Sequence, residues 1–518
     1  MVFWFYHPMM RLIDNFINSI TMYRLTLYGL IALAAVAVIF GFTGTLAYGG
    51  WMLLGSALLL VAACYGSNVL LARAFRAARN VESALITGLI LFLIMPPATS
   101  WRNAPLLVAA GVIAMASKYL LAIDRKHLFN PTAVAAVIIG LATGGGAIWS
   151  VGSSAMAPFV TVVGLLMVRK IRQFHLVVAF WAASLATIVV TGGAPLPSAP
   201  TATAALDFFN QTFNTWPILF FGFIMLTEPL TSPPTKRLQV AYGLLVGLLF
   251  GSSLHVGPIY ATPEVSLVIG NLFAYAVSSK KRLRLTLKEK TQLTPDSYHF
   301  SFIPDRRLAF RPGQYLEWTL PHHHSDRRGN RRYFTIASGP NEPTIGIGVK
   351  INQHSSSFKR ALLALQPGEV VTAGQLAGDF TLPEDARKVA LIAGGIGITP
   401  FRSMVRSFID ADQRRDVILL YAGTSASDFA YRDVFDQAKQ KIGFKTVYVI
   451  TNKDNVQAGW SGEAGYLTPA IIERQVPDYR SRTFYLSGPD AMVRSYRRLL
   501  RTMGVARGQI KVDYFPGY

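Results

Sequence analysis

The sequence predicts a polytopic α-helical membrane domain of about ten helices at residues 1–280, a β-barrel at 281–384 and an α/β domain with a parallel sheet at 385–518. The chain has 518 residues, of which 51% are hydrophobic and only 15% are charged, so it is too apolar for a wholly soluble protein. The apolar excess is local: 14 Lys/Arg and six Asp/Glu precede residue 280, whereas 36 and 22 follow from there on. The hydrophobic periodicity also changes at this point.

The membrane domain is predicted from apolar runs that cross, or largely cross, a hydrocarbon layer about 30 Å thick. Gly and Pro interrupt several of them. The runs lie at residues 24–44, 49–72, 83–96, 104–121, 131–146, 155–168, 174–192, 215–230, 238–253 and 264–278.

Basic residues between these runs indicate the orientation, because short cytoplasmic loops are rich in Lys and Arg. Only Arg102 falls on the opposite side. The cytoplasmic set is Arg11, Arg24, Arg73, Arg76, Arg79, Lys118, Arg125, Lys126, Arg169, Lys170, Arg172, Lys236, Arg237, Lys280, Lys281, Arg282 and Arg284. We therefore expect a multi-pass protein of the cell (inner) membrane with both termini in the cytoplasm. Because the basic residues before Lys280 lie in short clusters between apolar runs, as membrane topology requires, we do not expect the net charge of +22 to indicate nucleic acid. The first ten residues lack the basic region and cleavage site of a signal peptide.

Two segments of the membrane domain resemble each other. Residues 91–100 (LFLIMPPATS) and 223–232 (FIMLTEPLTS) are both apolar runs that end at Pro and continue into polar residues. About five helices separate them, which predicts an inverted repeat of five plus five helices.

Four separated segments of the membrane domain form a recognisable set: residues 82–97, 129–133 (FNPTA), 227–233 (TEPLTSP) and Glu264 followed by 270–274 (GNLFA). In these segments the domain resembles the NqrB/RnfD family of membrane flavin subunits. The resemblance implies a ten-helix subunit that carries flavin in a respiratory or ferredoxin-linked electron-transfer complex.

The family commonly attaches FMN to a Thr, and here the sequence departs from the family motif. The nearest segment, residues 198–203 (SAPTAT), lacks the acidic residue and the Gly of that motif. Thr203 is the best candidate for an FMN attachment site and Thr201 the next. The alternative is a loop that carries no flavin.

Acidic residues are costly in hydrocarbon and are therefore candidates for function. Glu228 lies at a helix break, where it could meet a ligand or pair with Lys236 or Arg237. For Glu82 and Glu264, near predicted helix starts, we expect an interaction with the helix dipole.

From Leu283 onward, period-two alternation predicts strands up to about Pro383. Residues 311–320 (RPGQYLEWTL) and 331–338 (RRYFTIAS) resemble the ferredoxin-NADP reductase superfamily, whose barrel binds FAD through an Arg-x-Tyr-Ser/Thr motif. The resemblance assigns FAD contacts to Arg332, Tyr333, Phe334 and Thr335.

These residue types suit a flavin. A guanidinium can bind the pyrophosphate, the ring of Phe334 can pack on the isoalloxazine, and Thr335 can hydrogen-bond near its N5. Ser356 and Ser357 stand where the family has a turn and helix N-terminus for the pyrophosphate.

A glycine-rich turn directly follows a predicted strand, residues 389–393, and opens a helix. In that context backbone amides approach a dinucleotide. The turn contains Gly394, Gly395, Gly397, Thr399 and Pro400.

Residues 485–489 (YLSGP) match the family's loop that orients nicotinamide, with Ser487 in place of the frequent Cys, followed by Gly488 and Pro489. Near the C-terminus, Phe515 is predicted to lie against the flavin, with Asp513 nearby; a final strand with core aromatics is the alternative. Thr335, Ser487 and Phe515 are thus the candidate catalytic residues.

Other redox centres are not expected. Cys64 is the only cysteine, and an iron–sulfur cluster needs about four ligands. The histidines of the membrane half, at positions 7, 127, 175 and 255, do not form the stacked pairs that haem requires. The run His322 to His324 is expected to be solvated, and no metal site is predicted.

The sequence therefore predicts a membrane-bound, FAD-dependent NAD(P)H oxidoreductase. Hydride passes from nicotinamide to FAD, and single electrons pass into the membrane domain, to a second flavin such as FMN, to a quinone or to another acceptor. The alternatives are a redox-driven or redox-regulated transporter and a mere membrane anchor. Residues 423–428 contain no Arg pair for a 2′-phosphate, which favours NADH. The expected partners are lipid, nicotinamide nucleotide and an unidentified electron acceptor.

Overall fold

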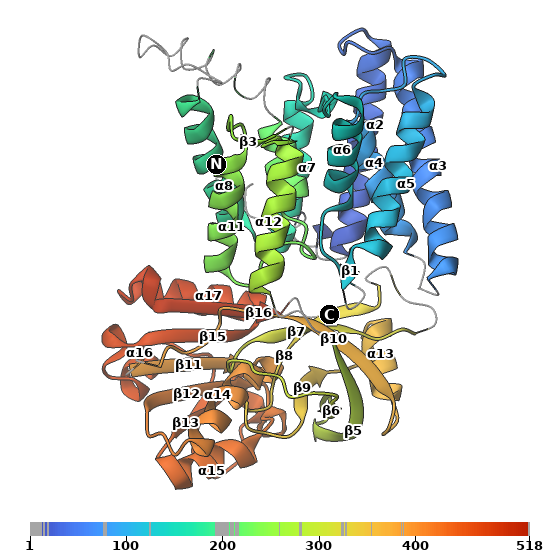
Figure 1. The fold of residues 1–518 in the computed structure, drawn as a ribbon. Helices are drawn as coiled ribbons and strands as arrows, with labels where there is room; N and C mark the ends of the chain where they lie inside the picture. Colours follow the sequence, from blue (N-terminus) through green and yellow to red (C-terminus); the bar gives the residue numbers. More distant parts are fainter. Residues whose placement is uncertain are drawn as a thin grey trace. The chain divides into compact units, whose positions relative to one another are not determined.

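The structure is a computed structural model that divides into two compact units, Met1–Lys280 and Lys281–Tyr518, each described here by itself (Figure 1). The described residues are 13, 16–17, 20–75, 80–123, 126–191, 207, 212, 217–257, 259–278, 282–322, 326, 329–353, 355–384, 386 and 388–515.

The N-terminal unit is helical, and each predicted apolar run overlaps one of its helices. Two short hairpins, β1 (Ala122–Ile123) with β2 (Lys126–His127) and β3 (His255–Val256) with β4 (Ile259–Tyr260), lie between helices. The helices are α2 (Met22–Phe42), α3 (Gly50–Ala74), α4 (Val81–Ile94), α5 (Ala104–Leu120), α6 (Pro131–Thr143), α7 (Ala157–Ile171), α8 (Phe174–Val190), α10 (Ile218–Phe220) continuing as the π-helix η2 (Phe221–Met225), α11 (Lys236–Leu249) and α12 (Pro263–Val277).

Helix packing in this unit follows one scheme twice. In the first half α2 and α3 contact α4, α3 contacts α5 and α5 contacts α6; in the second half α7 and α8 contact η2, α8 contacts α11 and α11 contacts α12. The equivalent helices also touch each other, α2 with α7 and α6 with α12. Both α6 and α12 begin with a capping residue followed by Pro, Asn130–Pro131 and Thr262–Pro263. This repetition is what the predicted pair of five-helix repeats would produce.

Helix length separates these elements into two groups. Among the described residues, two helices are long and apolar enough to cross a membrane, α2 with 21 residues and α3 with 25. Five others, α4, α5, α6, α8 and α12, are apolar but have only 10–17 residues. Among the described residues, the expectation of ten crossing helices is thus met in length and hydropathy by two of them.

The C-terminal unit begins with an antiparallel sheet in the order β8-β7-β10-β5-β6-β9. Its edge strands β8 and β9 also contact each other, so the sheet curls toward a barrel around a core that contains Phe300, Phe302 and Trp318. Its elements are β5 (Leu283–Thr294), β6 (Ser297–Pro304), β7 (Tyr315–Thr319), β8 (Arg331–Thr335), β9 (Ile345–Lys350), α13 (Ser357–Ala364) and β10 (Val370–Ala377).

A parallel sheet in the order β14-β13-β12-β11-β15-β16 follows. Strand order runs outward from β11 to β14 and then resumes at β15 on the other side of β11, which makes the β11/β15 pair the topological switch point, where ligands bind in open α/β sheets. Its elements are β11 (Lys388–Gly394), η3 (Gly395–Ile398), α14 (Thr399–Asp410), β12 (Asp416–Gly423), η4 (Ala426–Asp428), α15 (Arg432–Ile442), β13 (Lys445–Ile450), β14 (Glu463–Ala464), α16 (Pro469–Gln475), β15 (Thr483–Pro489), α17 (Asp490–Thr502) and β16 (Ile510–Phe515). The antiparallel sheet and the parallel α/β sheet confirm the fold predicted for this half.

Candidate functional site

The carboxyl ends of β11 and β15 bring the two predicted nucleotide motifs together. Ala393 pairs with Ser487 across the parallel ladder, so the glycine-rich turn and the loop at Ser487 to Pro489 are neighbours. A Cβ on Gly397 would lie 2.5 Å from Cα of Gly488 and 2.6 Å from the carbonyl oxygen of Ser487. Only glycine permits this close backbone approach at the switch point.

The turn itself has the geometry expected for a dinucleotide. Gly395 adopts a left-handed φ of +52°, and its carbonyl oxygen accepts a 3.1 Å hydrogen bond from the hydroxyl of Tyr421. A Cβ on Gly394 would lie 2.3 Å from the sulfur of Met492. Thr399 and Pro400 form the first turn of α14, where backbone N–H groups lack helical partners and can face an anion.

Ser487 is the most informative side chain of this crevice. Its hydroxyl is buried and, among the described residues, has no hydrogen-bond partner. A buried hydroxyl without a partner costs about 1–3 kcal/mol, so a ligand that supplied the missing hydrogen bond would be stabilised at this position. Ser487 also pairs with Asp513 of β16, and Pro489 pairs with Phe515. The side chain of Phe515 lies outside the described part, and its contact with the flavin stays a prediction.

Strand β8 carries the predicted flavin residues. Because side chains alternate along a strand, Arg332 and Phe334 share one face. Both approach the ring of Phe358 in α13, the guanidinium carbon at 5.3 Å and the ring of Phe334 at 5.9 Å between centroids. Tyr333 lies on the other face, 49% exposed, with its ring edge-on to Tyr315. The four predicted flavin residues are therefore divided between two faces of β8, with Arg332 and Phe334 on one and Tyr333 and Thr335 on the other.

Thr335 and the start of α13 complete the flavin candidates. Thr335 is buried and pairs with Tyr315 of β7. Ser356 caps α13 by accepting a hydrogen bond from the amide of Lys359 at 3.4 Å. Ser357 is the first residue of the helix and is also buried.

His322 contacts the start of α13. It is half-buried, its Nε2 lies 2.9 Å from the hydroxyl of Ser357 and its Nδ1 lies 2.8 Å from the carbonyl oxygen of Leu320. It is therefore partly solvated, as predicted, and also makes two contacts within the barrel. His323 and His324 lie outside the described residues.

Two polar contacts join the barrel to the parallel sheet. Arg402 of α14 forms a two-pronged ion pair with Glu342, which holds the pKa of that carboxyl below its usual range despite its burial. His299 of β6 contacts Tyr431, the residue that precedes α15. Burial, together with the nearby Arg402, lowers the pKa of His299 to about 4. These contacts fix the two walls of the crevice against each other.

Comparison with known proteins agrees with this geometry. Residues 391–498 match the family model of the oxidoreductase NAD-binding domain. The C-terminal half is thus similar to reductase domains of the ferredoxin-NADP reductase type, which bind FAD and NAD(P)H. Relatives include the glycine betaine monooxygenase reductase subunit of Chromohalobacter salexigens, 28% identical over 218 residues (41% of this chain, 58% of the relative), and the flavohemoprotein of Oceanobacillus iheyensis, 29% identical over 238 residues (44% and 57%).

The reductase half also has counterparts among solved structures. The Amycolatopsis cytochrome P450 reductase GcoB has a TM-score of 0.41 and 24% identity over 46% of this chain and 71% of that one. The FAD/NAD-binding domain of the nitric oxide dioxygenase of Vibrio cholerae has a TM-score of 0.41 and 22% identity over 45% and 98%. This chain spans less than three-fifths of the length of the two curated relatives.

The residues of the reductase half fit its cofactors. The hydroxyl of Ser487 has no partner in the part of the chain that the structure describes, and it lies at the switch point, where nicotinamide and flavin would meet. Arg332 and the amino end of α13 offer cationic and N–H groups to a pyrophosphate. The reductase half is an oxidoreductase, as the sequence predicted.

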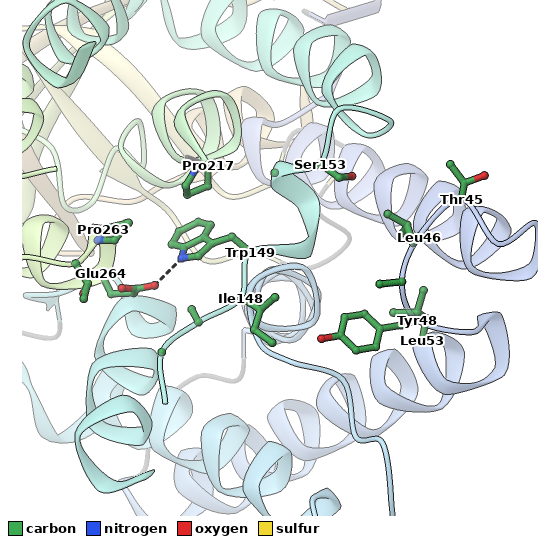
Figure 2. A pocket seen from close by; sticks show the side chains of 15 residues that line it. Thr45, Leu46, Tyr48, Leu53, Ile148, Trp149, Ser153, Pro217, Pro263 and Glu264 are labelled. Atoms are coloured by element: carbon green, nitrogen blue, oxygen red, sulfur yellow. Dashed lines mark hydrogen bonds between the residues drawn. The ribbon is translucent and has the colours of Figure 1, made fainter. Parts of the chain in front are cut away.

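A second candidate site lies in the helical unit. Figure 2 shows the indole of Trp149 joined to the carboxylate of Glu264, with Ile148 and Tyr48 across the cavity. The cavity has a volume of about 550 Å³ and is lined by the α2–α3 loop, the segment before α7 and the start of α12. Glu264 is 4% exposed and accepts a 2.7 Å hydrogen bond from Nε1 of Trp149. The backbone of Trp149 adopts a left-handed φ of +53°. Backbone strain of this kind concentrates at functional sites.

Glu228 is held in a network of its own. Its carboxylate contacts Nε2 of His127 at 3.2 Å and accepts a hydrogen bond from the amide group of Asn130 at 3.0 Å. The backbone N–H of Asn130 donates in turn to Asn271 of α12 at 2.8 Å. These contacts tie the segment after η2 to the start of α6, and both predicted alternatives for Glu228, a ligand contact or a pair with Lys236 or Arg237, stay predictions. Glu82 and Glu264 lie in the first turns of α4 and α12, as expected, and Glu82 also pairs with Arg24.

Several predicted sites cannot be placed, and several observed ones were not predicted. Thr203 and Thr201 lie outside the described residues. No sequence signal points to three contacts between residues distant in the chain. They are Trp149 with Glu264, His299 with Tyr431 and Asp326 with Ser357. Among the described residues, no group of three or more His, Cys, Asp or Glu side chains could hold a metal ion.

Proposed function

We propose that this chain is a membrane-bound oxidoreductase that takes electrons from cytoplasmic NAD(P)H through FAD and passes them into its helical unit. The observation that carries the proposal is the switch-point crevice, where the glycine-rich turn and the unpartnered hydroxyl of Ser487 converge in the same chain as apolar helices long enough to cross a membrane. When bound, FAD accepts a hydride from nicotinamide and releases electrons one at a time.

The residues of the reductase half have separate tasks in this scheme. The turn around Gly397 and the first turn of α14 bind the dinucleotide phosphates, and the hydroxyl of Ser487 orients the nicotinamide. Arg332 binds the flavin pyrophosphate, and Phe334 packs beside the ring system. The pair Arg402–Glu342 keeps the barrel and the nucleotide sheet in register.

NADH is the proposed electron donor. At the carboxyl end of β12, the carboxylate of Asp428 accepts hydrogen bonds from the amides of Thr424 and Ser425 at 2.8 and 3.0 Å. In dinucleotide-binding sheets an acidic residue near this position suits the ribose 2′-hydroxyl, and it repels a 2′-phosphate. The steady-state specificity constants for NADH and NADPH test this preference, and a higher value for NADPH would contradict it.

The helical unit is proposed to hold the electron acceptor. The resemblance to the NqrB/RnfD family supports a second flavin there, such as FMN on Thr203, and the cavity at Glu264 lies within the size range of small-molecule sites, about 300–1,000 Å³. A quinone is the alternative acceptor. Because the curated relatives are named as an oxygenase reductase and a flavohemoprotein, a separate redox partner is a further candidate.

A redox-driven transporter is the second candidate function. The observation that favours it is the two-fold repeat of the helical unit, since many transporters are built from inverted repeats around a central site. Denaturing extraction followed by mass spectrometry counts the flavins and detects any that stay attached to Thr203. Two flavins per chain support electron passage, whereas one flavin with NADH-dependent ion uptake into liposomes supports transport.

A further inference from the structure

We propose that Asp326 occupies the position of the flavin pyrophosphate and that FAD binds by displacing its carboxylate. This inference rests on the proposed function, because it assumes that the barrel takes FAD. One carboxylate oxygen of Asp326 accepts a hydrogen bond from the backbone N–H of Ser357 at 3.0 Å, at the amino end of α13. The other oxygen lies 3.4 Å from a guanidinium nitrogen of Arg332.

These two partners are the groups that a pyrophosphate would use. A helix N-terminus offers free N–H groups and the positive end of the helix dipole, and a guanidinium offers a planar pair of donors. Together they form an anion site. The side chain of Asp326 fills that site with an anion from the protein itself.

The hydroxyl of Ser357 is also engaged. The carbonyl oxygen of Leu320 can only accept, so Nδ1 of His322 donates to it, and Nε2 of the same ring lies 2.9 Å from the hydroxyl of Ser357. The hydroxyl oxygen of Ser357 also accepts a 2.9 Å hydrogen bond from the backbone N–H of Asp326. The hydroxyl of Ser357 is therefore held by His322 and by the same residue that caps α13.

Two anions cannot share this site without strong repulsion. The carboxylate and a pyrophosphate would stand within a few ångströms in a partly buried place, where charges are poorly screened. FAD binding therefore requires the carboxylate to leave Arg332 and Ser357. Asp326 is in this sense a positioning residue that sets the affinity of the barrel for a pyrophosphate-bearing flavin.

The test measures FAD binding by the full chain after its flavin has been removed. Asp326→Asn keeps an oxygen that can cap α13 but removes the charge, so we expect its Kd for FAD to fall about tenfold or more. Asp326→Glu keeps the charge and should retain the wild-type Kd. As a matched control, Asp296→Asn removes a carboxylate that pairs with Lys350 on the same barrel, and it should leave the Kd unchanged.

The outcomes separate this inference from the proposed function. If the wild-type chain binds no FAD, both are wrong. If it binds FAD but Asp326→Asn binds with equal or weaker affinity, the barrel takes FAD and Asp326 serves only to cap α13, which overturns the inference. If Asp326→Asn fails to fold, Asp326→Ser, which keeps a capping oxygen, takes its place with the same expected result.

Discussion

The imidazole Nδ1 of His299 lies 2.9 Å from the hydroxyl of Tyr431, and this hydrogen bond joins strand β6 of the barrel to the residue before α15. The rings meet edge-on at 5.5 Å. Both residues are distant from the nucleotide motifs in sequence. Their contact nevertheless bridges the two sheets that bound the catalytic crevice.

The lowered pKa of His299 makes the stability of the reductase half depend on pH. The pKa of His299 falls from 6.5 to about 4 through burial and the nearby Arg402, so the unfolded chain binds a proton between these values and the folded chain does not. The free energy of unfolding should therefore decrease as the pH falls from 6.5 to 4, by at most roughly 3 kcal/mol. Thermal release of flavin from the full chain at several pH values measures it. His299→Gln, which cannot titrate, should flatten the dependence; an unchanged slope would refute the assignment.

Gly397→Ala tests the close approach at the switch point. The new Cβ would meet the backbone of Gly488 at 2.5 Å, and backbone atoms cannot move aside as a flexible side chain can. We expect flavin reduction by NADH to slow by about 100-fold, because a displacement of the reacting groups by about one ångström lowers the rate by that factor. Gly508→Ala is the control, since a Cβ at that position meets open space. Equal rates in both variants would argue against a nucleotide at this turn.

Ser487→Ala should separate stability from rate. Its hydroxyl is buried without a partner among the described residues, so removing it should leave the free energy of unfolding unchanged or raise it by about 1 kcal/mol. Stopped-flow flavin reduction should nevertheless slow about tenfold, the effect of one lost hydrogen bond to the nicotinamide. Ser403→Ala should instead lower the free energy of unfolding and leave the rate of flavin reduction unchanged, because the buried hydroxyl of Ser403 donates to the carbonyl oxygen of Ser338 at 2.6 Å. A Ser487→Ala enzyme of undiminished rate would remove Ser487 from the site.

Asp428→Asn addresses the choice of nucleotide. The amide keeps an oxygen for the N–H groups of Thr424 and Ser425 but loses the negative charge that faces a 2′-phosphate. We expect the ratio of specificity constants for NADPH and NADH to rise about tenfold. Steady-state kinetics with both nucleotides measures the ratio. If it does not change, Asp428 does not select the nucleotide.

Glu264→Gln tests the cavity of the helical unit. The amide can still accept the hydrogen bond of Trp149, so the fold should persist, while the charge offered to a ligand disappears. Flavin reduction by NADH should stay at the wild-type rate. Reoxidation through the helical unit should slow by about tenfold or more, because the loss of one hydrogen bond to a charged group lowers the rate by that factor. Equal reoxidation rates would exclude Glu264 from the acceptor site.

The nucleotide site could be predicted because its signals are local. The strand before Gly394 and the helix after Thr399 are both readable from periodicity, and Ser487 to Pro489 carry a short motif of their own. Parallel pairing of β11 with β15 then brings them together, as such sheets generally do.

The remaining contacts are nonlocal and could not be predicted. Trp149 and Glu264 are 115 positions apart. No sequence pattern predicts that the backbone of a tryptophan adopts a left-handed conformation. Asp326 contacts Ser357, which is 31 positions away, and nothing in the sequence distinguishes its carboxylate from the other carboxylates of the reductase half.

Anaerobic addition of NADH, and separately of NADPH, to the purified full chain tests the central claim most directly. The protein should be yellow as isolated, and its flavin absorbance should bleach when either nucleotide reduces it. A colourless protein reconstituted with FAD that still binds none, or a yellow protein whose absorbance persists with both nucleotides, would contradict the account.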